Sequence, residues 1–170
     1  GIRVIDPVTE LELRARYSTR LLDLRRNKGM SAAHAQRQVY DPNVFACLMV
    51  ELGEADAVLG GLTTFYPETI RPALQIIRLE EHRTIASSVY VVYINGTPYF
   101  FTDCAVNIEP SSEELAEIAV AACEVARDQF DRNPRVAFLS YSDFGSATGD
   151  EPARVRRAVQ IFHERCPDVP

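Results

Sequence analysis

The sequence lacks several patterns on which common functional assignments depend. Its four cysteines include no Cys-x-x-Cys pair, and no cysteine and histidine group has zinc-ligand spacing. We therefore predict no metal site and expect reduced thiols packed as small apolar groups, as in a reducing compartment. The GxxxxGK[ST] phosphate loop is absent, and so is the GxSxG spacing of a nucleophile elbow.

The sequence also lacks an apolar run long enough to cross a bilayer, and its N-terminus carries no charged-then-apolar leader. We therefore expect a cytoplasmic protein with no membrane partner. The 170 residues carry a net charge of −6. Such an acidic surface repels phosphate backbones, so we expect no nucleic-acid partner. An anionic ligand would need a local cluster of arginines.

What is present is an ordinary globular composition, with 46% hydrophobic and 25% charged residues. Apolar periodicity and turn residues predict alternating helices and strands, and hence an α/β fold. The predicted helices cover residues 7–27, 31–40, 43–52, 68–79, 112–129 and 152–165, and the predicted strands cover residues 55–59, 88–94, 99–106 and 135–142. In an α/β fold a strand would follow the last helix, so we expect the sheet to be truncated at the C-terminus.

Local signals mark several ends of these elements. Gly29 can take the left-handed conformation that ends a helix, and Ser31 can cap the next one. Asp41 followed by a proline is a helix start, and Asn95 followed by a glycine predicts a tight hairpin. Ser111 with a glutamate three residues later forms a capping box.

Three segments are candidates for a binding site, each with a purely structural alternative. The cations of residues 25–28 could clamp a phosphate or simply complement a helix C-terminus. The Gly-Gly and hydroxyl-rich stretch of residues 60–72 could face an anion with backbone N–H groups, or could be a capped turn. The hydroxyl-rich loop of residues 139–146 is better read as a structural turn.

Two smaller groups of polar residues give weaker signals. Asp103 follows a predicted strand and could be either a surface carboxylate or part of a site. His34, His82 and His163 lie in charged surroundings, so we expect them to be exposed to solvent.

Five segments, in this order along the chain, resemble motifs of the phosphate acetyl/butyryltransferase family. They are residues 41–56 (DPNVFACLMVELGEAD), 69–75 (TIRPALQ), 99–107 (YFFTDCAVN), 111–119 (SSEELAEIA) and 136–145 (VAFLSYSDFG). The forms at residues 66–69 and 143–145 look most like the related domains carried at the C-terminal end of bacterial hybrid malic enzymes. The resemblance covers nearly the whole chain.

The resemblance implies a three-layer α/β/α fold with a mainly parallel sheet, of the isocitrate dehydrogenase-like phosphotransacetylase type. Two subdomains flank the ligand cleft in that fold. Residues 1–84 would belong to the first α/β subdomain and residues 85–170 to the second. By the same resemblance Arg25 and Arg71 match arginines linked with CoA or acetyl-CoA binding, and Thr64 and Tyr66 fall beside them in the expected site. Guanidinium groups suit the phosphates of CoA.

The family's catalytic serine–arginine pair and base aspartate belong to a later motif that this chain does not reach. We therefore predict no catalytic residue here and no acyl transfer by this chain alone. Tyr66, where transferases tend to have a small hydroxyl residue, would also crowd the phosphate site.

The resemblance implies a regulatory domain that binds acetyl-CoA and modulates an attached malic enzyme, which would oxidatively decarboxylate malate to pyruvate. NAD(P) and Mg²⁺ or Mn²⁺ would then be cofactors of the parent catalytic domain only, with none in this chain. The expected partners are an acyl-CoA and further copies of the protein in a homo-oligomer. Two alternatives remain: part of a phosphate acetyl/butyryltransferase, which converts acetyl-CoA and phosphate to acetyl phosphate and CoA, and an assembly domain without a ligand.

Overall fold

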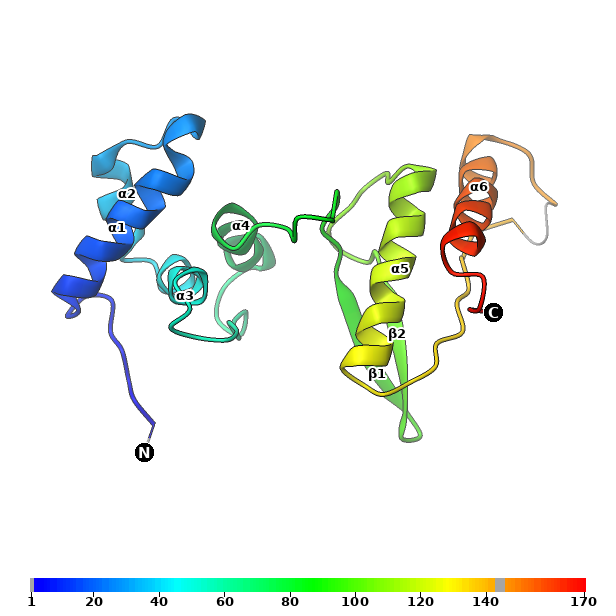
Figure 1. Cartoon of the computed structure of the whole chain (residues 1–170), viewed down its shortest axis with the longest axis horizontal. Coiled ribbons are helices and arrows are strands. Elements are labelled where there is room, and N and C mark those ends of the chain that lie inside the picture. Colours follow the sequence, from blue (N-terminus) through cyan, green and yellow to red (C-terminus); the bar gives the residue numbers. More distant parts are fainter. Residues whose placement is uncertain (1, 143–145) are drawn as a thin grey trace. The chain divides into compact units, whose positions relative to one another are not determined.

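The computed structural model describes residues 2–142 and 146–170, which form two compact units, Gly1–Glu80 and Glu81–Pro170 (Figure 1). The first unit is helical, and the second combines a hairpin with two long helices. Each unit is described by itself below.

Four helices and one 3-10 turn make up the described part of the first unit, and several of their ends lie where the local signals place them. The first helix begins at Leu11 and not at residue 7, and the helix predicted at residues 68–79 covers Tyr66–Ile76. Gly29 adopts φ +83° and ends the 3-10 turn, while the side chain of Ser31 accepts a hydrogen bond from the N–H of His34 at 3.2 Å. Asp41 caps the next helix by accepting from the N–H of Asn43 at 2.8 Å. These predictions are confirmed. The elements are α1 (Leu11–Arg25), η1 (Arg26–Lys28), α2 (Ala32–Gln38), α3 (Pro42–Glu51) and α4 (Tyr66–Ile76).

One apolar cluster holds the first unit together. Tyr17 and Leu21 of α1 pack with Phe45 and Leu48 of α3, and Ile76 adds the contribution of α4. The rings of Tyr17 and Phe45 meet edge to face with their centroids 4.6 Å apart. Burial of such side chains contributes about 1.5–3 kcal/mol each, which makes this cluster the main source of stability for the unit.

The second unit contains a two-stranded antiparallel hairpin and two helices. Its elements are β1 (Val89–Ile94), β2 (Thr97–Thr102), α5 (Ser112–Asp128) and α6 (Asp150–Arg165). The predicted tight turn is confirmed, since Asn95 and Gly96 have φ values of +50° and +80°. The predicted capping box is confirmed too: Ser111 and Glu114 each accept a hydrogen bond from the other's backbone N–H, at 3.2 and 2.7 Å. Helices α5 and α6 pack side by side over a shared apolar cluster (Figure 1).

Two predicted strands are wrong. Residues 55–59 and 135–142 form no strand in the structure. Their apolar runs fit a buried strand, but a strand also needs a neighbour with which to exchange backbone hydrogen bonds. Within residues 2–142 and 146–170 the sheet is the two-stranded antiparallel β1–β2 pair, so the fold is α/β and the mainly parallel three-layer sheet stays a prediction.

The chain divides into the two units after Glu80, four residues before the predicted boundary at residue 84. Arg83 forms an ion pair with Glu124 of α5, and Thr84 donates its backbone N–H and hydroxyl to Glu117 at 2.7 and 2.5 Å. These contacts fasten residues 83–84 to the second unit. That the units are parts of the two subdomains stays a prediction.

No helix of the described residues is long and apolar enough to cross a membrane. The part of the chain that the structure describes also contains no cluster of three or more histidine, cysteine or carboxylate side chains that could hold a metal ion.

Candidate functional site

Thr64 and Tyr66 lie together at the start of α4. The hydroxyl oxygens of Thr64 and Thr69 are 3.0 Å apart, which fixes the loop to the first turn of the helix. Gly60 passes close to the same turn: a Cβ there would come within 3.3 Å of a Thr69 methyl group and 3.5 Å of an Asn43 side-chain oxygen. The Gly-Gly stretch therefore approaches the beginnings of α3 and α4 without a side chain in the way.

Arg25 lies near the other end of α4. It ends α1, and the preceding residue, Leu24, accepts a hydrogen bond at 3.4 Å from the side chain of Arg78, two residues beyond the helix. An 11-residue helix is about 16 Å long. Arg71 lies between these points and is exposed. The structure thus places Thr64 and Tyr66 together, and it shows no contact among the described residues that joins either of them to Arg25 or Arg71.

Arg25 and Arg71, unlike Arg16 and Arg20, have no side-chain partner among the described residues. Arg20 forms an ion pair with Glu51, the last residue of α3, and Arg16 forms one with Glu54, three residues further along the chain. Among the described residues, no hydrogen bond or ion pair engages the guanidinium of Arg25 or Arg71, and the Nε of Arg25 is buried. These two guanidinium groups therefore have unused donors for an anionic ligand.

Polar contacts that the sequence did not predict join α1 to α3 and to the turn after it. Tyr17 donates its hydroxyl hydrogen to Glu54, which also accepts from Arg16. Burial, with the Glu54 carboxylate as a second cause, raises the pKa of Tyr17 to about 12. The available signal was the helical spacing of Tyr17 and Leu21, which puts the tyrosine on the buried face.

Asp103 has a structural role in the described residues. It follows β2 with φ +58°, and its carboxylate accepts a hydrogen bond at 3.2 Å from the side-chain amide of Asn107. The same amide donates to the carbonyl of Ala86 at 2.9 Å, so Asn107 ties the loop after β2 to the segment before β1. In the loop of residues 139–146, the predicted Asp143, Phe144 and Gly145 form lies outside the described residues. His34, His82 and His163 are exposed, as predicted.

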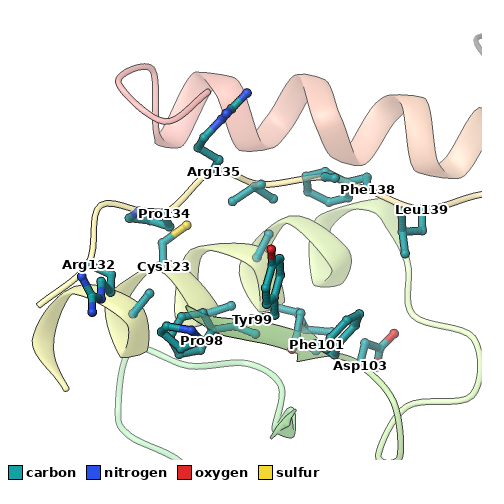
Figure 2. Close-up of a pocket in the computed structure, with 18 of the residues that line it drawn as sticks. Pro98, Tyr99, Phe101, Asp103, Cys123, Arg132, Pro134, Arg135, Phe138 and Leu139 are labelled. Atoms are coloured by element: carbon teal, nitrogen blue, oxygen red, sulfur yellow. The ribbon is translucent and has the colours of Figure 1, made fainter. Parts of the chain in front are cut away.

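A cavity of about 950 Å³ lies within the second unit (Figure 2). Residues 96–103 of the hairpin line one side, residues 132–139 line the opposite side, and α5 contributes the floor. Its surface is mostly apolar, and none of Arg25, Thr64, Tyr66 or Arg71 lines it. The residues that line the cavity all belong to the second unit.

Comparison with known proteins shows which family has this arrangement. Residues 1–170 match, without a break, the family described as phosphate acetyl/butaryl transferase. The chain belongs to the phosphate acetyl/butyryltransferase family. A phosphate acetyltransferase of Synechocystis is 39% identical over 168 residues, and that of Bacillus subtilis is 37% identical over 169 residues. The EutD phosphotransacetylase from Staphylococcus aureus superposes with a TM-score of 0.80 at 32% identity.

The chain spans about half or less of the length of these relatives. The alignments cover 99% of this chain, but only 24% of the Synechocystis protein, 51% of the Bacillus protein and 50% of the solved EutD chain. The relatives are named as acyltransferases, so they support the alternative of a phosphate acetyltransferase. They give no support to the malic-enzyme interpretation, nor to the NAD(P), metal and allosteric roles that depended on it.

Proposed function

We propose that this chain is part of a phosphate acetyltransferase, which transfers an acetyl group between the thiol of CoA and phosphate. The observation that carries the proposal is that the phosphate acetyltransferases of Synechocystis and Bacillus subtilis are 39% and 37% identical to the chain over 168 and 169 residues. Proteins that share a fold can act on different substrates, so the residues of the site must also support the proposed activity.

In this proposal the first unit supplies contacts to the nucleotide part of CoA. Arg25 ends α1 and Arg71 lies in α4, and within residues 2–142 and 146–170 neither guanidinium forms an ion pair with a carboxylate. CoA carries a diphosphate and a separate 3′-phosphate, so two separated guanidinium groups could each bind one of them. Thr64 and Tyr66 would lie at the reacting end, where Tyr66 limits the room beside the loop.

The catalytic serine–arginine pair of the family lies outside the matched motifs of this chain. The proposal therefore assigns binding to these residues and the transfer step to the longer enzyme. Thiol deprotonation and carbonyl polarisation need groups held in place, so the 170-residue chain by itself is expected to be inactive.

The test uses a chimera in which these 170 residues replace the matched half of the Bacillus subtilis phosphate acetyltransferase. Formation of acetyl-CoA from acetyl phosphate and CoA is expected in the chimera and not in the 170-residue chain. Arg71→Ala should raise the KM for CoA roughly tenfold or more, because a charge-assisted hydrogen bond is lost. Arg37→Ala, an exposed change on α2, is the matched control.

Calorimetry of the 170-residue chain with CoA gives a second measurement that does not depend on the chimera. Saturable heat that Arg71→Ala reduces and Arg37→Ala preserves supports the binding role. Heat indistinguishable from dilution, with the chain shown to be folded by circular dichroism, argues against a CoA site in the first unit.

A further inference from the structure

The two long helices of the second unit lie side by side and run in the same direction. The hydroxyl of Ser112, the first residue of α5, donates a hydrogen bond at 2.9 Å to the carbonyl oxygen of Arg154, near the beginning of α6. Figure 1 shows both helices running from that end, α5 toward yellow and α6 from orange to red. Because an α-helix rises by about 1.5 Å per residue, residues that are equally far from this contact lie level with each other.

Cys123 lies on the face of α5 that meets α6. Its side chain is 1% exposed and belongs to the apolar cluster that also contains Phe162 of α6. Ala116 and Ala119 lie in the same cluster, and their small side chains allow the two helices to approach closely. Figure 2 shows the sulfur of Cys123 pointing out of α5, toward the side on which α6 lies.

Cys166 lies level with Cys123 at the end of α6. Cys123 is about three turns, or roughly 16 Å, beyond Ser112. Cys166 is about three turns, or roughly 18 Å, beyond Arg154. It packs against the same apolar cluster, and it is partly exposed where Cys123 is buried. Equal height and a shared cluster therefore bring together two thiols that are far apart in the sequence.

The backbone of Cys166 allows its sulfur to adjust. This residue is the C-cap of α6 with φ −131° and ψ +65°, so its backbone has already left the helix. A disulfide needs its two Cα atoms about 4.4–6.8 Å apart. Because Cys166 follows the last helical residue, it can reach that separation without bending either helix.

The ionisation of Cys123 is a second sign that the two sulfurs are near each other. Burial raises the pKa of the Cys123 thiol, the charge that Cys166 carries as a thiolate raises it further, and Arg127 acts in the opposite direction. Charges affect each other in this way over short distances, because solvent and ions screen longer ones. Cys123 therefore stays a thiol, while Cys166 is the more accessible of the two.

We propose that Cys123 and Cys166 are a redox pair that hydrogen peroxide converts to a disulfide, which links α5 to the end of α6. The partly exposed Cys166 reacts first: its thiolate attacks one peroxide oxygen, the O–O bond breaks, water leaves, and a sulfenic acid remains. The sulfur of Cys123 then attacks that of Cys166, the S–O bond breaks, and the oxygen leaves as water with the thiol proton of Cys123. Two thiols are oxidised for each peroxide that is reduced.

The other two cysteines lie outside this arrangement. Cys47 is buried in the apolar cluster of the first unit. Cys104 is exposed after β2, where its thiol donates to the carbonyl of Thr102 at 3.6 Å. Neither belongs to the cluster that holds Cys123 and Cys166, so both serve as internal controls.

The first test is the pairing of the four cysteines after the folded 170-residue chain reacts with hydrogen peroxide. Cleavage after glutamate places each cysteine in a different peptide, with Cys123 in residues 118–124 and Cys166 in residues 165–170. Mass spectrometry without reduction should find these two peptides joined, at roughly tenfold or more above any other pairing. Dithiothreitol should separate them again.

Two variants and an unfolded sample are the controls for this test. Cys104→Ser should form the disulfide to the same extent, because Cys104 lies outside the cluster, whereas Cys166→Ser should leave Cys123 as a free thiol. Pairing in the folded chain that matches the pairing in concentrated urea would overturn the proposal, since the fold would then not select these two sulfurs. Oxidation of Cys166 to a sulfinic acid while Cys123 stays reduced would also overturn it.

The second test asks whether the disulfide fits the folded second unit. Methionine is also oxidised by peroxide, but both methionines, Met30 and Met49, lie in the first unit. The NMR methyl signals of the buried Ile118 and Ile161 therefore report the second unit by itself. In Cys104→Ser protein, peroxide should raise the Tm measured from these signals by roughly 10 °C, because a disulfide constrains the unfolded chain.

The same measurement has a control and an opposite outcome. Combining Cys104→Ser with Cys166→Ser should abolish the shift in Tm. A cross-linked protein whose Tm is unchanged or lower would show that the sulfurs meet only in a distorted fold, and the proposal would be wrong. Both tests are independent of acetyl transfer, so failure of the proposed function leaves them intact.

Discussion

The hydroxyl of Tyr17 offers the clearest test of how the first unit is held together. The substitution Tyr17→Phe keeps the ring that packs on Phe45 and removes only the hydrogen bond to Glu54. A hydrogen bond to a charged group contributes about 1.5–3 kcal/mol. Because the Glu54 side chain is 30% exposed, water competes for it, so we expect a loss of about 1–2 kcal/mol.

The same substitution should change the response of the protein to alkaline pH. Burial raises the pKa of Tyr17 to about 12, above the value of about 10 in an unfolded chain. The phenol is neutral when protonated, so its contribution to stability is complete below about pH 10 and is lost as the pH rises toward 12. Wild-type protein should therefore lose stability across that range, and its advantage over Tyr17→Phe should shrink.

The assay is urea denaturation from pH 7 to 11.5, followed by the NMR methyl signals of Leu21 and Leu48, which lie in the core of the first unit. Tyr40→Phe is the matched control, because Tyr40 is 49% exposed and its ring, over which Arg14 stacks, is retained. If Tyr17→Phe and Tyr40→Phe unfold at the same urea concentration at pH 7, the Glu54 contact contributes nothing and the reasoning is refuted. An advantage over Tyr17→Phe that stays constant above pH 10 would refute the pKa argument.

Two further predictions concern single local contacts. Burial acts to raise the pKa of Glu117, but the hydrogen bonds from Thr84 outweigh it, and the pKa is lowered. The carboxylate therefore stabilises the fold above its unfolded pKa of about 4.3, and this contribution is lost as the pH falls through the lower pKa of the folded state. Urea denaturation between pH 3 and 7 should show a weaker acid dependence for Glu117→Gln than for Glu113→Gln, an exposed change on the same helix, and identical profiles would contradict this. The Cβ that Gly29→Ala adds would meet no atom within 4 Å. The variant should lose about 1 kcal/mol of unfolding free energy in thermal denaturation, because alanine is strained in the left-handed backbone conformation of this position. Gly29→Asn should cost less, and an Ala variant as stable as wild type would show that the backbone is not held there.

Much of the helical structure was predictable because its signals are local. Ser31 and Asp41 bond to N–H groups two or three residues away, and Ser111 does the same. Such contacts depend on a few neighbouring residues and not on the rest of the fold. The hairpin turn at Asn95 was predictable for the same reason, since two residues decide its geometry.

The sequence by itself thus determined several helix ends, the place where the chain reverses, and, through its ordered motifs, the family. Only the tertiary structure decided which apolar runs become strands: residues 55–59 and 135–142 have suitable composition, but a strand needs a partner remote in sequence. The tertiary structure also decided which arginines form ion pairs. Arg16 pairs with Glu54, which lies 38 residues later in the sequence, while Arg25 and Arg71 pair with no carboxylate among the described residues. Such pairings depend on how helices pack, which no short stretch of sequence specifies.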